Sequence, residues 1–187
     1  MDMSRQIKNI IAITVFLICI GLINVAGQNI EIEIRGMNAF TFILIIAVLL
    51  QVIFFIPSFL LKTEKYFDIV GSLTYIITIS IAYFSVENKT MIDSIIYFYV
   101  MVWASRLGIY LFRRVRNDGK DIRFEKAKRH FFWFLQYWMG QALWVSLTAC
   151  AAIIAILSPE DNTLPVFAMI GMAPVSYTHL TLPTRAQ

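Results

Sequence analysis

Long apolar runs, separated by short polar segments, divide this chain of 187 residues. A membrane-spanning helix needs about 20 mostly apolar residues, because the hydrocarbon core of a bilayer is about 30 Å thick. Backbone groups in lipid must hydrogen-bond internally, which favours helices. The pattern predicts transmembrane helices over residues 9–27, 39–61, 69–86, 94–112 and 131–157, and a sixth that begins near Leu164 and is cut short.

These runs predict an all-α fold: a polytopic transmembrane helix bundle with five complete helices plus a truncated sixth. Composition agrees, since 59% of the residues are hydrophobic and 15% are charged, against about 25% charged residues in soluble domains. No polar stretch is long enough to form a separate soluble domain. Pro57, near the end of the second predicted helix, is expected to kink or end it.

The short connections carry positive charge on alternate sides. The N-terminal segment, residues 62–68 and residues 113–130 contain two, two and eight Lys or Arg residues, whereas the other three connections contain one, one and none. Cytoplasmic loops are enriched in Lys and Arg. The alternation therefore predicts a cytoplasmic N-terminus and a basic cytoplasmic loop from Arg113 to His130, in a multi-pass protein of the bacterial inner membrane.

The C-terminal residues 175–187 do not continue this pattern. The string VSYTHLTLPT resembles the translation of a sequencing-library adapter, and a natural polar tail is the alternative. The adapter interpretation divides the chain into a membrane domain over residues 1–174, part of a longer bundle, and an artefactual tail over residues 175–187. It also leaves His130 as the one genuine histidine.

The residue types limit the chemistry. Cys19 and Cys150 lie within apolar runs, and the sequence has no His or Cys cluster with metal-ligand spacing. With His130 as the one genuine histidine, the sequence does not favour a histidine-based catalytic triad. Glycine-rich fingerprints of nucleotide-binding sites are absent from the sequence. We therefore predict no metal site, assign no catalytic residue, and look to the charged and aromatic residues at the cytoplasmic side.

Arg106 is the most informative of these residues, because it lies within the predicted fourth helix. A cation there costs roughly 2.5–3.5 kcal/mol at the centre of a span. Either it has a functional role or its side chain snorkels to the headgroups. Arg113 follows seven residues later, on nearly the same helix face.

Residues 113–130 have a net charge of +5 from eight basic and three acidic side chains. Arginine binds phosphate through paired donors, so this segment could hold a nucleotide. It could also attract anionic lipid, or only set the topology. A tethered loop this short is unsuited to nucleic acid. At the other connection, Asp68 is expected to cap the third helix, and a binding role is the alternative.

Two stretches of the sequence carry a family resemblance. They are KTEKYFDIVGSLTYI and WASRLGIYLFRRVRNDGKDIRFEKAKRHFFWFLQYWMGQALWVSL, and together they span roughly residues 60–150. They resemble membrane proteins related to steroid 5-alpha-reductase, closest to a bacterial branch long catalogued as a domain of unknown function. The motifs are Asp68 with Gly71 and Ser72, Arg106-Leu107 followed by Arg113, Asp121-x-Arg123-Phe124, and Gln141.

The resemblance implies a bundle of about seven helices and an NADPH-dependent reduction of the carbon–carbon double bond in a steroid- or lipid-like enone. Hydride would go to the β carbon while a polar group stabilises charge on the carbonyl oxygen. The implied partners are the bilayer and a hydrophobic small molecule. The resemblance also implies a cofactor region lined or faced by Arg106, Arg113, Asp121, Arg123, Asp68 and Gln141.

One departure limits this expectation. The C-terminal run of the family, similar to Arg-His-Pro-Asn-Tyr, has no counterpart in this sequence. We therefore expect a fragment that is inactive alone, from a parent enzyme. Two alternatives stay open: a non-enzymatic membrane protein that binds lipid or a partner, and a methyltransferase of the isoprenylcysteine type that uses S-adenosyl-methionine.

Overall fold

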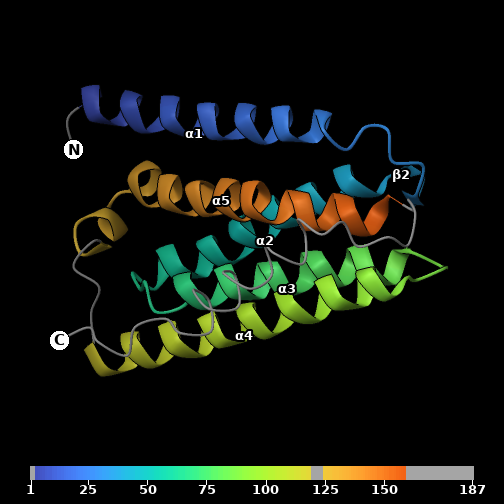
Figure 1. Ribbon diagram of the computed structural model, residues 1–187. Coiled ribbons are helices and arrows are strands. Elements are labelled where there is room, and N and C mark those ends of the chain that lie inside the picture. The colour runs from blue at the N-terminus through green and yellow to red at the C-terminus, as the bar shows by residue number, and fades with distance from the viewer. Residues whose placement is uncertain (1–2, 119–123, 159–187) are drawn as a thin grey trace.

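A computed structural model of the protein describes residues 3–118 and 124–158, with side chains for 3–114 and 124–158. Within these ranges the chain forms a bundle of five long helices (Figure 1). A small hairpin of β1 (Glu33–Ile34) and β2 (Met37–Asn38) follows the first helix, and a 3-10 turn, η2 (Ala127–Arg129), precedes the last. The long helices are α1 (Met3–Val25), α2 (Ala39–Leu60), α3 (Phe67–Ser85), α4 (Met91–Asp118) and α5 (Phe131–Leu157).

All five long helices of the described ranges are long and apolar enough to cross a membrane. The predicted all-α polytopic bundle is therefore confirmed, and the chain is a multi-pass integral membrane protein. Many large apolar side chains on α1 stay exposed, such as Ile11 at 56% and Leu22 at 66%. Contact with lipid explains this exposure, because lipid tails solvate apolar side chains and water does not.

Two helices extend six residues beyond a predicted bound. α1 begins at Met3 instead of residue 9, and α4 continues to Asp118 instead of ending at residue 112. The expected loop from Arg113 to His130 was therefore wrong at its start, because Arg113 and Arg114 belong to α4. Hydropathy marks where a helix leaves lipid, but a helix can continue into water when its residues favour helix. The predicted sixth helix near Leu164 lies outside the described residues.

Successive helices run in opposite directions (Figure 1). The start of α1, the connection from α2 to α3, and the end of α4 with the start of α5 therefore share one end of the bundle. We call this the basic end, because Arg5, Lys65, Arg114 and Arg129 all belong to it. The predicted grouping of the connections is confirmed, while the placement of the basic end in the cytoplasm stays a prediction from the charge pattern.

The helices form a layered arrangement in which α1 and α4 occupy opposite sides (Figure 1). α1 packs mainly on α5, α5 also contacts α2 and α3, and α4 packs mainly on α3. Away from the basic end, the core contains fully buried apolar side chains such as Phe40, Ile43 and Ile79. A buried polar bond joins α2 to α3, from Gln51 Nε2 to Thr74 Oγ1 at 2.9 Å.

An aromatic cluster forms the core at the basic end, and its rings come from four separate segments. The ring centroids of Phe67 and Trp138 are 5.2 Å apart, and those of Phe55 and Phe134 are 5.8 Å apart. Such edge-on and tilted pairs add stability beyond apolar burial. Phe124, from the segment between α4 and α5, lies 4.8 Å from Phe67. The cluster thus fixes this segment onto α3 and α5.

The end of α2 lies within one turn of Pro57, where the sequence predicts a kink or an end. The proline lies inside α2, and the helix ends three residues later at Leu60. The Leu61 N–H donates to the Pro57 carbonyl at 2.9 Å, and the Thr63 N–H donates to the Ser58 carbonyl at 2.9 Å. These bonds satisfy carbonyl groups that the end of a helix would otherwise leave without partners. The short turn that follows leads directly into α3.

Candidate functional site at the basic end

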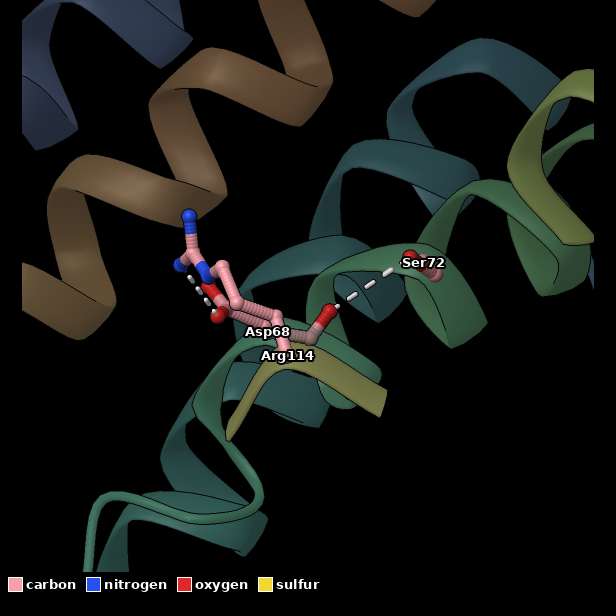
Figure 2. Close-up of polar contacts among 3 residues, drawn as sticks. All are labelled: Asp68, Ser72 and Arg114. Carbon is pink, nitrogen blue, oxygen red and sulfur yellow. Dashed lines mark hydrogen bonds and ion pairs between the residues drawn. The ribbon is translucent and has the colours of Figure 1, made fainter. Parts of the chain in front are cut away.

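Asp68 and Arg114 form an ion pair between α3 and α4 (Figure 2). Arg114 Nη2 lies 3.3 Å from Asp68 Oδ2, and the side chains are 40% and 13% exposed respectively. The carboxylate is largely shielded from solvent, so its attraction to the guanidinium is stronger than in a fully exposed pair. Ser72 Oγ donates to the Asp68 carbonyl at 3.4 Å. The pair ties the first turn of α3 to α4.

The predicted capping role of Asp68 was wrong. The N-cap of α3 is Tyr66, which makes no side-chain capping bond, and the helix begins at Phe67. Asp68 lies inside the first turn, and its carboxylate is directed to Arg114. A negative charge is still favoured there, because the N-terminal end of the helix dipole is positive. Asp68 therefore joins a helix to its neighbour instead of satisfying the N–H groups of its own helix.

Two close approaches hold α3 against its neighbours, and both depend on glycine. A Cβ atom at Gly71 would lie 2.3 Å from Gln141 Nε2, on α5. A Cβ atom at Gly108, on α4, would lie 2.9 Å from Ser72 Cβ. Small residues permit such close packing between transmembrane helices. The site is thus a junction of three helices within one turn of Asp68.

The side-chain carbonyl oxygen of Gln141 is a hydrogen-bond acceptor that none of its described neighbours uses. Its Oε1 atom is buried and has no hydrogen-bond partner among the described residues. A buried carbonyl oxygen without a donor costs free energy. An atom of this kind beside Gly71 offers a hydrogen-bond acceptor inside the junction of α3 and α5. This is consistent with Gln141 facing the same region as Asp68.

Phe124 positions residues 124–130, which directly precede α5. Its side chain is 2% exposed and its ring centroid lies 4.9 Å from that of Tyr137. Lys128 Nζ lies 2.7 Å from Glu64 Oε2, with side chains 19% and 5% exposed. A buried apolar anchor and a shielded ion pair thus hold the segment to the rest of the basic end.

Two hollows flank α4 near the site. One, of about 480 Å³, lies between α3 and α4 and is lined mostly by apolar side chains, with Ser72, Ser105 and Arg113 among them. The other, of about 630 Å³, follows the outer face of α4 and includes Arg106 and Arg113. Both hollows share Ser105, Ile109 and Arg113, so they meet along α4. Hollows of this size and apolar character suit a small hydrophobic ligand.

The structure brings the predicted site residues together in two groups. Gln141 contacts Gly71, one turn from Asp68, so these residues lie close together. Arg106 and Arg113 line the same hollow, which confirms that they share a face of α4. The hollow between α3 and α4 connects the groups, because it contains both Ser72 and Arg113. Asp121 and Arg123, predicted for the same site, lie outside the described residues.

Comparison with known protein families assigns residues 54–181 to a family described as protein of unknown function (DUF1295). This match includes well over half of the chain. The chain belongs to this family. Comparisons with curated proteins and with solved structures gave no match.

The DUF1295 match includes the whole site. It begins within α2 and contains α3, α4 and α5, whereas α1 and the hairpin precede it. DUF1295 is a membrane protein family, in agreement with the long apolar helices. The six predicted site residues and the pair of Asp68 with Arg114 all lie in the DUF1295 region.

Two features of this DUF1295 site were not predicted from the sequence. Arg114 was counted among the basic residues, but Arg113 was assigned to the site and Arg114 was not. Consecutive helical residues differ in direction by about 100°, so helical phase relative to α3 decides which of the two meets Asp68. The pair of Glu64 with Lys128 joins residues 64 positions apart, and no local sequence pattern indicates such a contact.

Proposed function

We propose that this protein is an NADPH-dependent membrane reductase that acts on the carbon–carbon double bond of a steroid- or lipid-like enone. The observation that carries the proposal is the hollow of about 480 Å³ between α3 and α4, which is lined mostly by apolar side chains and contains Arg113. It joins a space suited to a hydrophobic molecule with a cation suited to a phosphate group. Ser72 and Arg113, from two of the motifs that resemble the steroid 5-alpha-reductase family, line this hollow.

The hydrophobic part of the proposal rests on access from lipid. The hollow on the outer face of α4 is bordered by exposed apolar side chains, including Phe98 at 64% and Ile109 at 54% exposure. It meets the inner hollow at Ser105, Ile109 and Arg113. A ligand dissolved in the bilayer could pass along α4 to reach the polar end of the hollows. This route suits a steroid or another lipid-like substrate.

The cofactor part rests on the cations at the basic end. NADPH carries a pyrophosphate and a 2′-phosphate, and arginine binds such groups through paired N–H donors. Arg113 is exposed, and Arg114 keeps 40% of its side chain exposed beside Asp68. These residues fit the charge of the cofactor, which when bound would supply the hydride for the reduction. Asp68 would orient Arg114, and Gln141 would offer its amide to the same region.

The location follows from the same charges. We propose that the basic end faces the cytoplasm of a bacterial cell and that the helices cross its inner membrane. Cytoplasmic loops are enriched in Lys and Arg, and the segments at the basic end contain most of these residues in the connections. NADPH in the cytoplasm would then reach Arg113 and Arg114 from water, while the substrate arrives from lipid.

A cofactor titration tests the proposed function. The gene is read past the codon for Pro174, its complete product is purified in detergent, and NADPH is added while tryptophan fluorescence is followed. We expect saturable quenching that the Arg113→Gln variant weakens at least tenfold, since the variant loses a charge-assisted bond to phosphate. The control, Lys65→Gln, removes an exposed cation at the same end and should bind as the wild type does.

The same titration separates the alternatives. Absence of NADPH binding by a folded wild-type protein would overturn the reductase proposal. Binding of S-adenosyl-methionine in place of NADPH would favour the methyltransferase. If neither binds, and Arg106→Gln lowers only the retention of anionic lipid, the protein is a non-enzymatic lipid-binding protein.

A further inference from the structure

A second basic hollow lies at the basic end, between α1 and the start of α5. Its volume is about 420 Å³, and it is lined by Arg5, Glu125, Lys126, Arg129, His130 and Trp133. Three of these side chains are cationic and one is anionic, which leaves a net charge of +2 with the histidine neutral. None of these residues belongs to the hollows along α4. The structure therefore holds a positively charged hollow that the proposed reductase site does not use.

Trp133 organises this hollow. The guanidinium carbon of Arg5 lies 5.5 Å from the centre of the Trp133 ring, and the His130 ring stacks on the same indole at 6.1 Å. A guanidinium over an indole face is held by the ring quadrupole. Residues from α1, from the segment before α5 and from α5 itself thus converge on one ring, although Arg5 and Arg129 are far apart in the sequence. A topology signal alone does not require that convergence.

A hollow lined mostly by aromatic side chains continues from Trp133 into the bundle. Its volume is about 330 Å³, and it is lined by Phe16, Trp133, Gln136, Tyr137 and Gly140. Trp133 is shared with the basic hollow. Gly140 lies seven residues after Trp133 on α5, which corresponds to roughly 10 Å along the helix at about 1.5 Å per residue. The two hollows therefore form a path from a cationic surface at the end of the bundle to an aromatic cleft within the span.

We propose that this path is a binding site for one anionic phospholipid. The phosphate would lie among Arg5, Lys126 and Arg129, and the upper part of an acyl chain would lie against Phe16 and Tyr137. Basic pockets at the cytoplasmic side of membrane proteins bind anionic headgroups, and tryptophan favours the level of the headgroups. The charge excludes a zwitterionic lipid as the preferred occupant, because such a headgroup gains no net attraction from the site.

Two other cations at the basic end differ from this group. Lys128 pairs with Glu64 at 2.7 Å, and Arg114 pairs with Asp68 at 3.3 Å. Their charges are thus partly neutralised by acids of neighbouring segments. Arg5 and Arg129 are exposed and line a common hollow. A lipid phosphate there would link α1 to the segment before α5, and α1 otherwise packs mainly on α5.

Lipid retention measured by native mass spectrometry tests the proposal. The purified chain is exchanged into detergent with equal amounts of phosphatidylglycerol and phosphatidylcholine, and retained lipid is counted. We expect one retained phosphatidylglycerol. The Arg5→Gln/Arg129→Gln variant should bind it roughly thirtyfold more weakly, since each cation near a headgroup contributes about a fivefold gain in affinity.

A matched control separates the site from general surface charge. The Lys8→Gln/Lys65→Gln variant loses the same charge from exposed positions of α1 and of the connection between α2 and α3. It should retain the lipid as the wild type does. Equal weakening in both double variants, or equal retention of the two lipids, would overturn the proposal. Inorganic phosphate that competes as well as the lipid does would reduce the site to a phosphate site and contradict the lipid assignment.

The acyl-chain part is tested at Gly140. A Cβ atom there would lie 3.4 Å from the Phe16 ring, so Gly140→Ala should fold with little change, whereas Gly140→Leu should fill the cleft. We expect Gly140→Leu to lower the affinity for phosphatidylglycerol at least tenfold while binding of glycerol phosphate stays unchanged. If Gly140→Leu fails to fold, Gly140→Ala provides a smaller side chain that fills part of the cleft. Unchanged affinity for the lipid in both variants would contradict this path for the chain.

Discussion

Asp68 and Arg114 lie 3.3 Å apart although 46 positions separate them in the sequence. Their ion pair joins the first turn of α3 to the part of α4 that extends beyond its most apolar stretch. It therefore ties the start of α3 to the cationic last turns of α4. The proposed cofactor region depends on this link, because Arg113 and Arg114 are presented by the same turn of α4.

Removal of the Asp68 charge should weaken this link measurably. We expect Asp68→Asn to lower the free energy of unfolding by about 1 kcal/mol, since one side chain of the pair is well shielded and the other is partly exposed. Arg114→Gln should cost a similar amount, and the double variant less than the sum of the two. Unfolding in a series of denaturing detergent mixtures measures this coupling. Additive losses would contradict a direct interaction between the two side chains. Glu87→Gln, at an exposed position, serves as the control.

The contact of Gly71 with Gln141 should be visible in a double-mutant cycle. Gly71→Ala places a methyl group where Gln141 Nε2 now lies, at 2.3 Å, and overpacking typically costs 1–3 kcal/mol. Gln141→Ala in the same background should recover most of that loss, because the obstructing amide is gone. Thermal unfolding in detergent measures each variant. A double variant that is no more stable than Gly71→Ala would show that the two residues do not meet.

The ion pair of Glu64 with Lys128 should contribute to the free energy of unfolding, because it is largely buried. Lys128→Met removes the cation beside a carboxylate that is 5% exposed, and loss of one partner of a buried pair costs about 3 kcal/mol. Glu64→Gln in the same background should restore much of the stability, since a neutral amide is cheaper to bury than a charge. The free energies of unfolding of the single and the double variant decide this. A Lys128→Met variant as stable as the wild type would exclude a structural role for the pair.

Phe124 should couple the segment before α5 to the proposed cofactor site. Phe124→Ala removes a ring that is 2% exposed within the aromatic cluster, which typically costs 3–5 kcal/mol. Because the ring anchors this segment, the variant should also lose affinity for NADPH in the titration described above. The control is Phe84→Ala, which changes an aromatic residue of α3 that is 69% exposed. Wild-type affinity for NADPH in a folded Phe124→Ala variant would show that Phe124 does not influence the proposed cofactor site.

The sequence predicts the helices of this protein well because one physical cost dominates. Burial of charge in lipid is so unfavourable that the apolar runs mark the spans to within a few residues for α2, α3 and α5. The same cost does not act on a helix outside the bilayer. For this reason α4 continues to Asp118, and its cationic last turns were predicted as loop.

The site is less predictable from the sequence, because it depends on contacts between helices. The hydrophobic pattern does not give the rotation of one helix relative to another, so Arg113 was assigned to the site while Arg114 meets Asp68. The hairpin of β1 and β2 was also missed, although Arg35 and Gly36 both adopt positive φ in its turn. A turn of this kind is favoured by glycine, and this local signal was present in the sequence.

Accessibility of single cysteines in intact cells tests the central claim, that the basic end faces the cytoplasm. Cys19 and Cys150 are first replaced by Ala, and then Lys126→Cys at the basic end and Asn88→Cys between α3 and α4 are introduced separately. Both positions are exposed. A membrane-impermeant thiol reagent should label Cys at position 88 in intact cells, and label Cys at position 126 only after the membrane is opened. Labelling of position 126 in intact cells, with position 88 protected, would contradict the topology and the cytoplasmic access proposed for NADPH.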